Sequence, residues 1–169
     1  IENGTDLLNK VIEVNHPLSY KGYVFYQSNY GWDWENPTME IWTRKKSDPE
    51  YLEKNTLQVG QKVMLSDQQT EILAKHFIPD FIIGEGNQIT TRSMNPNNPA
   101  ALIEGWQGEE KVFASWAFSR YPDFSQMHEG ADSDYVIEFK DFSAAQFSGI
   151  QLSHDPGVNL IWAGCVLLM

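Results

Sequence analysis

The sequence predicts a mainly β fold, an antiparallel two-sheet sandwich or barrel-like domain, with a C-terminal segment that would begin a transmembrane helix. Aromatic and β-branched residues gather in short segments, and glycine or proline separates these segments. After Asp155-Pro156-Gly157 the chain becomes apolar. We therefore expect two parts: a β domain over residues 1–155, and a separate apolar segment over residues 156–169.

Nine short segments have the residue types and the spacing of strands in a sandwich or barrel. They are Val11–Val14, Tyr23–Ser28, Met39–Thr43, Lys62–Leu65, Ile72–Phe81, Ala101–Trp106, Val112–Phe118, Tyr135–Phe139 and Gln146–Leu152. The breakers expected between them are Gly22, Gly31, Pro37, Gly60, Gly84, Gly108 and Gly149. The expected core includes Phe25, Ile41, Val63, Phe77, Ile103, Phe113, Phe118 and Ile137.

Two segments lack the pattern of a strand. Asp48-Pro49-Glu50 has the residues of a helix start and Asn55 those of a helix end, so we expect a helical turn over Asp48–Lys54. Residues 84–100 carry Gly, Asn, Ser and Pro with little apolar periodicity, which predicts a long loop.

The apolar tail over Val158–Met169 has two interpretations. A membrane span needs about 20 apolar residues, so about a dozen can form only the first part of one. Trp162 and the small residues Ala163, Gly164 and Cys165 suit such a beginning. The alternative is a buried C-terminal strand or helix.

Composition limits the partners. The 169 residues fit one globular domain, and 41% of them are hydrophobic. The formal net charge of −11 argues against nucleic acid and against charge-driven binding to anionic lipid. The single cysteine, Cys165, allows no intramolecular disulfide and no Cys-x-x-Cys site. The chain starts at Ile1 without a signal peptide, and we interpret it as a fragment separated from its targeting elements.

The densest run of special residues is VNHPLSYKGYVFYQSNYG, residues 14–31. Pro17 favours an extended backbone before it, and Gly22 permits a sharp return into a second strand. Taken alone, this pattern predicts ordinary β packing.

The same run is similar to the signature "VN-x-PL-x-x-x-G-x-x-x-YQSSY" of the ResB-like family of cytochrome c biogenesis proteins. Two further stretches agree in order: Asn98-Pro99-Ala100 with Trp116 and Pro122-Asp123-Phe124, and then residues 147–152 leading into Asp155-Pro156-Gly157. Two positions depart from the signature, His16, where the family often has an acid, and Asn29, where it more often has serine. The matching positions of the first run are Asn15, Pro17, Leu18, Gly22, Tyr26, Gln27, Ser28 and Tyr30.

The resemblance implies a membrane-anchored subunit with this domain on the extracytoplasmic, periplasmic face. It would work with a ResC-type partner that handles haem, and would assist haem attachment to apocytochrome c. The resemblance also favours the transmembrane interpretation of the tail, in which residues 156–169 are the truncated start of a transmembrane helix. We expect no catalytic residue, no metal site and no cofactor in the isolated domain, because haem is handled by the full complex. The expected structural or interface residues are Asn15, Pro17, Gly22, Tyr26, Gln27, Asn98, Pro99, Trp116, Asp155, Pro156 and Gly157.

Imidazole is the usual protein ligand of haem iron, but the four histidines share no metal-ligand spacing. His16, His76 and His128 have ordinary strand or loop positions. His154 lies just before the apolar tail and is the candidate for a haem contact.

Two other functions remain open. Trp32 and Trp34 are two residues apart and would form an aromatic platform for a carbohydrate or another small molecule, although aromatic residues on a strand are more often core. The carboxylate pairs Asp33/Glu35 and Glu109/Glu110 suggest a hydrolase, but such pairs are expected by chance among 23 acidic residues.

Overall fold

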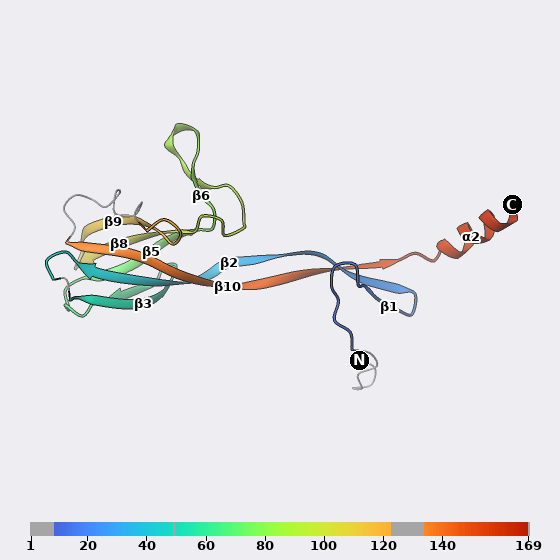
Figure 1. The fold of residues 1–169 in the computed structure, drawn as a ribbon, viewed down its shortest axis with the longest axis horizontal. Coiled ribbons are helices and arrows are strands. Elements are labelled where there is room, and N and C mark those ends of the chain that lie inside the picture. Colours follow the sequence, from blue (N-terminus) through green and yellow to red (C-terminus); the bar gives the residue numbers. More distant parts are fainter. Residues whose placement is uncertain (1–8, 49, 123–133, 169) are drawn as a thin grey trace. The chain divides into compact units, whose positions relative to one another are not determined.

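The computed structural model describes residues 9–48, 50–122 and 134–168 (Figure 1). The elements are β1 (Leu18–Tyr20), β2 (Tyr23–Lys45), β3 (Leu52–Gln58), β4 (Lys62–Met64), β5 (Glu71–Ile78), β6 (Phe81–Ile83), the 3-10 helix η1 (Glu85–Asn87), β7 (Ile89–Thr91), β8 (Ala100–Gln107), β9 (Glu110–Phe118), β10 (Tyr135–His154) and α2 (Val158–Leu167). The chain is mainly β, and β1–β2, β2–β3, β4–β5, β5–β8, β6–β7 and β8–β9 are antiparallel pairs. The prediction of a mainly β, antiparallel fold is confirmed.

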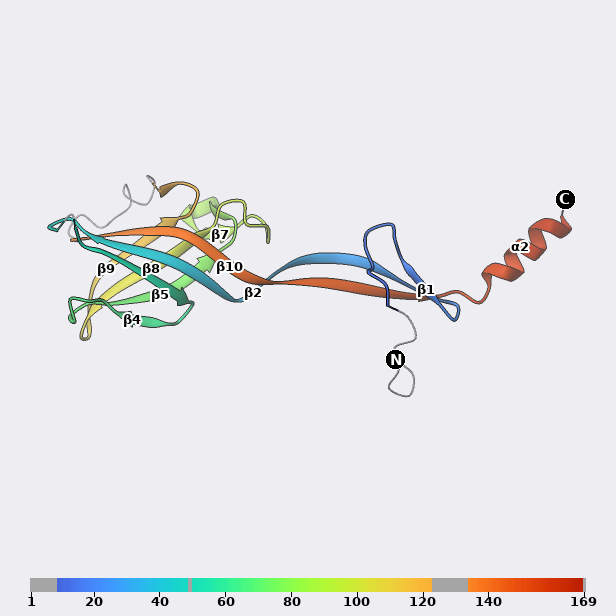
Figure 2. The ribbon, with the colours of Figure 1, turned by 60° about the horizontal axis from the view of Figure 1, so that its bottom comes forward.

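The chain divides into two compact units. We call residues 32–146 the sandwich unit, and residues 1–31 together with 147–169 the ribbon unit. Strands β2 and β10 pair with each other, lie side by side in both views, and each contribute residues to both units (Figures 1 and 2).

The sandwich unit has two sheets around one core. Strands β3, β2 and β10 form one sheet, and the other has the order β4-β5-β8-β9. Both sheets contribute fully buried side chains, for example Met39 and Ile41 from β2 and Ile72 and Ile103 from the second sheet. This burial removes apolar surface from water and is the main source of the unit's stability.

Most of the predicted core is correct. Ile41, Ile103, Phe113, Phe118 and Ile137 are buried. Phe25, Val63 and Phe77 are only half-buried, although Val63 and Phe77 pack against the core. Val63 lies on the edge strand β4, and Phe25 belongs to the ribbon unit, where none of the described residues is buried.

Three of the expected breakers do not interrupt a strand, because β2 and β10 continue through them. Pro37 precedes Thr38, where pairing with β3 begins, so its missing N–H interrupts no part of that ladder. A Cβ on Gly31 would lie 2.9 Å from the Phe147 ring, and one on Gly149 would lie 1.7 Å from Asn29 Oδ1. At these two positions glycine leaves room for a side chain of the neighbouring strand. The sequence alone does not distinguish such a glycine from one in a turn.

Three local predictions were also wrong. The expected helical turn at Asp48–Lys54 gives way to β3, whose residues pair with Thr38–Arg44 of β2. Val11–Val14 is not a strand, because the chain turns there and forms an isolated bridge between Glu13 and His16. The expected loop over residues 84–100 contains η1 and β7, and β7 pairs with β6.

The tail forms the helix α2, and its apolar side chains are exposed: Leu160, Ile161, Trp162, Val166, Leu167 and Leu168 are between 65% and 90% accessible. Within the described ranges, no helix is both long and apolar enough to cross a membrane.

Deleting Val158–Met169 is expected to leave the melting temperature nearly unchanged, because the exposed side chains of α2 contribute little burial. A change below about 2 °C corresponds to less than about 1 kcal/mol for a chain of this size. Thermal unfolding followed by circular dichroism measures it. A large drop would show that the tail belongs to the folded core.

Candidate functional site in the ribbon unit

The ribbon unit brings together two parts of the family signature that are far apart in sequence. Asn15, Pro17, Gly22, Tyr26 and Gln27 lie around β1 and the start of β2. The second part lies on the end of β10 and in the connection to α2, and comprises residues 147–152 and 155–157. Their assembly is the strongest reason to treat the ribbon unit as the candidate functional site.

A tight turn joins β1 to β2. Tyr20 pairs with Tyr23, and the two residues between them, Lys21 and Gly22, have φ angles of 47° and 83°. Two central residues with positive φ are typical of the turn that matches the twist of a hairpin. The glycine of the signature is therefore explained by the backbone of this turn. Asn15 also has a positive φ, 65°, in the preceding turn.

His154 packs against the β1–β2 turn. Its ring stacks on Tyr23, with the centroids 4.4 Å apart and the planes at 24°. A Cβ on Gly22 would lie 3.6 Å from His154 Nε2, an ordinary contact distance. The imidazole thus has a structural contact in the described part of the chain, while its proposed contact with haem stays a prediction.

Two side-chain hydrogen bonds link the first part of the signature to β10. Gln27 Nε2 donates to Ser148 Oγ at 3.1 Å, and Ser28 Oγ donates to the Gly149 carbonyl at 3.1 Å. Beside them lies an open depression of about 370 Å³ lined by Val14 and residues 27–30. Tyr26 is half-buried. Gln27 and Ser28 therefore help to hold the ribbon together.

The ribbon unit has no core of its own among its described residues, none of which is buried. Natural monomers rarely leave a large apolar surface open to water, and such surfaces usually mark a contact with a partner or a membrane. The apolar side chains exposed on this unit outside α2 are Val11, Val14, Tyr23, Tyr30, Phe147, Ile150 and Leu152, and Val158 is exposed at the helix start.

The middle part of the signature lies in the sandwich unit and has packing roles. Asn98 Nδ2 donates to the Phe81 carbonyl at 3.0 Å, and the Pro99 carbonyl accepts from the Ser119 N–H at 3.2 Å. The Trp116 ring meets Phe81 edge-on at 5.1 Å. Asp123, Phe124 and His128 lie outside the described residues.

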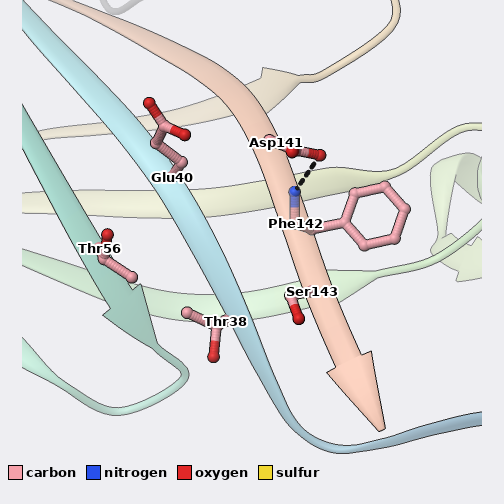
Figure 3. Close-up of a pocket in the computed structure, with 6 residues that line it drawn as sticks. All are labelled: Thr38, Glu40, Thr56, Asp141, Phe142 and Ser143. Atoms are coloured by element: carbon pink, nitrogen blue, oxygen red, sulfur yellow. Dashed lines mark hydrogen bonds between the residues drawn. The ribbon is translucent and has the colours of Figure 1, made fainter. Parts of the chain in front are cut away.

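A cavity of about 260 Å³ adjoins these residues and is lined by Phe81, Asn98, Phe118 and Tyr121. A second, smaller pocket of about 170 Å³ lies on the sheet formed by β2, β3 and β10 (Figure 3). Its lining residues are Thr38, Glu40, Thr56, Asp141, Phe142 and Ser143.

Asp80 is a buried carboxylate that the sequence analysis missed. It accepts hydrogen bonds from Arg92 Nη2 at 3.0 Å and Ser93 Oγ at 2.8 Å, and also from Asn97. The Arg92 guanidinium and these donors lower the pKa of Asp80 to about 2. The only sequence signal was an acid directly before an apolar segment, with a lone arginine twelve residues later.

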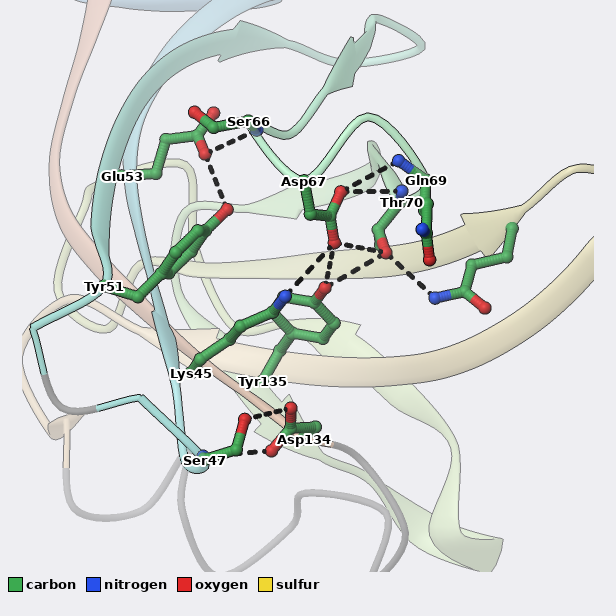
Figure 4. A network of polar contacts seen from close by, with 11 residues as sticks. Lys45, Ser47, Tyr51, Glu53, Ser66, Asp67, Gln69, Thr70, Asp134 and Tyr135 are labelled. Atoms are coloured by element: carbon green, nitrogen blue, oxygen red, sulfur yellow. Dashed lines mark hydrogen bonds and ion pairs between the residues drawn. The ribbon is translucent and has the colours of Figure 1, made fainter.

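A second polar network joins the ends of the sandwich strands (Figure 4). Burial alone would raise the pKa of Asp67, but hydrogen bonds from Tyr135 and Thr70 and from backbone N–H groups lower it below its usual range. Lys45 Nζ lies 3.5 Å from Asp67 Oδ2. Gln107 Nε2 extends the network by donating to Thr70 Oγ1 at 3.0 Å.

These two carboxylates predict how stability depends on pH. Because folding lowers their pKa values, they stabilise the fold above the unfolded value near pH 4, and this contribution is lost as the pH falls toward 2. Urea denaturation at pH 6, 4 and 3 measures the loss. Asp80→Asn should reduce the difference between pH 6 and pH 3, and an unchanged difference would contradict the assignment.

The tryptophans and the acidic pairs considered for other functions have structural contacts. Trp32 and Trp34 stack at 5.5 Å, Trp34 packs on Phe77 at 5.0 Å, and Trp34 Nε1 donates to the Met94 carbonyl. This cluster continues into the core through Phe139. Asp33 Oδ1 accepts the N–H of Glu35 within β2 at 2.9 Å, and the other acidic pair lies at the β8–β9 turn. Within residues 9–48, 50–122 and 134–168, no group of His, Cys, Asp and Glu is arranged to hold a metal ion.

Comparison with known proteins gives one family. The model of the ResB-like family matches residues 1–101 and residues 63–169, so the two matches together span the chain. No match was found among curated proteins or among solved structures. The chain therefore belongs to the ResB-like family, and with it to the membrane-associated machinery of cytochrome c biogenesis.

Proposed function

We propose that this domain is the extracytoplasmic docking part of a ResB-type subunit, which helps a ResC-type membrane partner to deliver haem to apocytochrome c. The ribbon unit makes the contacts, and the sandwich unit is the folded body that carries it. The domain has no enzymatic activity of its own, and haem is its cargo rather than a resident cofactor.

The observation that carries this proposal is the combination found in the ribbon unit. It holds most of the signature residues, it exposes apolar side chains, and none of its described residues is buried. An isolated two-stranded hairpin is marginally stable in water, and β1 pairs only with Tyr23–Phe25, so β2 and β10 form a two-stranded ribbon beyond these residues. A partner that packs on these side chains supplies a covering layer.

The chemistry of haem attachment fits a positioning role. The thiols of the apocytochrome must be reduced and must lie beside the haem vinyl groups, so orientation of the reactants is the main requirement. A thiol-reducing catalyst needs a pair of redox-active cysteines, and this chain contains only Cys165. What its residues supply is therefore placement of the partner and the acceptor.

Substitution of Tyr26 or Gln27 by alanine in the full-length protein is expected to lower cytochrome c assembly at least several-fold. Loss of Gln27 removes its bond to Ser148, and loss of Tyr26 removes half-buried contact area. Haem-stained cytochrome and co-purification of the ResC-type partner are the measurements. Tyr121→Ala, at a 58% exposed tyrosine of the sandwich unit, is the matched control. Variants that fold, keep the partner and mature cytochrome normally would contradict the proposal.

A further inference from the structure

Strand β10 leaves one edge open in the ribbon unit. Its sheet has the order β1-β2-β10, so among the described residues β2 pairs with one side of β10 and no strand pairs with the other. Every second residue of an edge strand directs its N–H and C=O outward. About four of the eight residues in Phe147–His154 therefore offer unpaired backbone groups.

This edge lacks the features by which proteins block strand addition. Lysine, proline and other charged residues are the usual protection on exposed edges. The segment Phe147–His154 contains no lysine, arginine, acid or proline, while Phe147, Ile150 and Leu152 are 48%, 50% and 53% exposed. In contrast, the edge strands β3 and β9 of the sandwich unit carry Lys54 and Lys111. The β10 edge is thus open to another strand.

We propose that the edge formed by Phe147–His154 binds an unfolded polypeptide segment as an added β-strand, and that this segment is the haem acceptor region of apocytochrome c. This inference rests on the proposed function and names the substrate class of the ribbon unit. Eight residues of strand extend over about 26 Å, enough to pair with an extended peptide of similar length. Backbone hydrogen bonds supply the affinity in this mode of recognition.

Charge and composition favour an unfolded substrate over a second copy of the chain. Two copies, each with a net charge of −11, repel each other. The edge also mixes its three apolar residues with the uncharged polar residues Ser148, Gln151 and Ser153. Such a composition is typical of transient interfaces, since permanent ones are larger and more hydrophobic. An unfolded acceptor that leaves after haem attachment needs a contact of this kind.

The test uses the full chain and a synthetic 12-residue peptide containing the Cys-x-x-Cys-His motif, with both cysteines replaced by serine. We expect the peptide to bind and to slow amide hydrogen exchange in residues 147–154. The double substitution Ile150→Lys with Leu152→Lys should weaken binding at least tenfold, because charges on both exposed positions oppose strand addition. Ile83→Lys, at a 60% exposed isoleucine of the sandwich unit, is the matched control and should bind as the unsubstituted chain does.

A peptide methylated on alternate backbone nitrogens separates strand addition from side-chain binding without altering the protein. It should bind at least tenfold more weakly than its parent. Equal binding of the two peptides, no binding, or protection outside residues 147–154 would overturn the inference. Slower exchange in residues 147–154 when the protein concentration is raised without peptide would overturn it too. That result would assign the edge to a second copy of the chain. Protection by the ResC-type partner and not by the peptide would overturn this inference and leave the proposed function standing.

Discussion

Phe139→Ala is expected to lower the free energy of unfolding by about 3–5 kcal/mol, the usual cost of removing a fully buried phenylalanine side chain. Phe139 is 2% exposed in the core of the sandwich unit, where its ring meets Phe77. The substitution removes its apolar contacts and leaves a cavity. Urea denaturation of the isolated chain, followed by fluorescence, measures the loss.

Phe147→Ala is the matched control, because the same residue type lies eight positions later on the same strand. Phe147 is 48% exposed in the ribbon unit, so its removal should cost less than about 1 kcal/mol. Similar losses at the two positions would contradict the description of the ribbon unit as a sheet without its own core.

Gly105→Val is expected to have the second large effect. A Cβ at this position would lie 2.0 Å from Cε1 of Phe113, far inside contact distance. Gly105 also stands at the irregularity in the pairing of β8 with β9, where a close approach of the backbone is accommodated. Overpacking of this kind costs about 1–3 kcal/mol or more.

The loss at Gly105 is measured by thermal unfolding, with Gly164→Ala as the control. Gly164 lies in α2, and a Cβ added there would have no atom of a neighbouring side chain within 4 Å, so alanine should cost nothing measurable. A second change, Phe113→Leu in the Gly105→Val background, should recover part of the stability. Full stability of Gly105→Val alone would mean that β8 and β9 are farther apart than described.

The sequence predicted the fold class because strands carry a local signal. Alternating apolar residues in segments such as Ala101–Trp106 and Val112–Phe118 identify a half-buried sheet without knowledge of its partners. Strand length was not predicted, since Gly31 and Gly149 look the same in a turn and at a close approach. For Leu52–Gln58, the pairing with β2 decides the conformation, and tertiary pairing overrides local propensity.

The sequence named the residues of the candidate site, but it did not show how they are arranged in space. The signature named Gln27 and the segment containing Ser148, but the hydrogen bond between them joins positions 121 residues apart. No local pattern contains such a pairing. The Asp80–Arg92 cluster was missed for the same reason, because it depends on the β6–β7 hairpin bringing an isolated acid and an isolated arginine together.

We propose that the ribbon unit makes the functional contacts. Amide hydrogen exchange of the full-length protein, with and without the proposed ResC-type partner, tests this most directly. We predict slower exchange on complex formation in residues 15–30 and 147–157, with the exchange of buried β5 and β8 unchanged. Protection confined to the sandwich unit, with the ribbon unit exchanging as in the free protein, would contradict the claim.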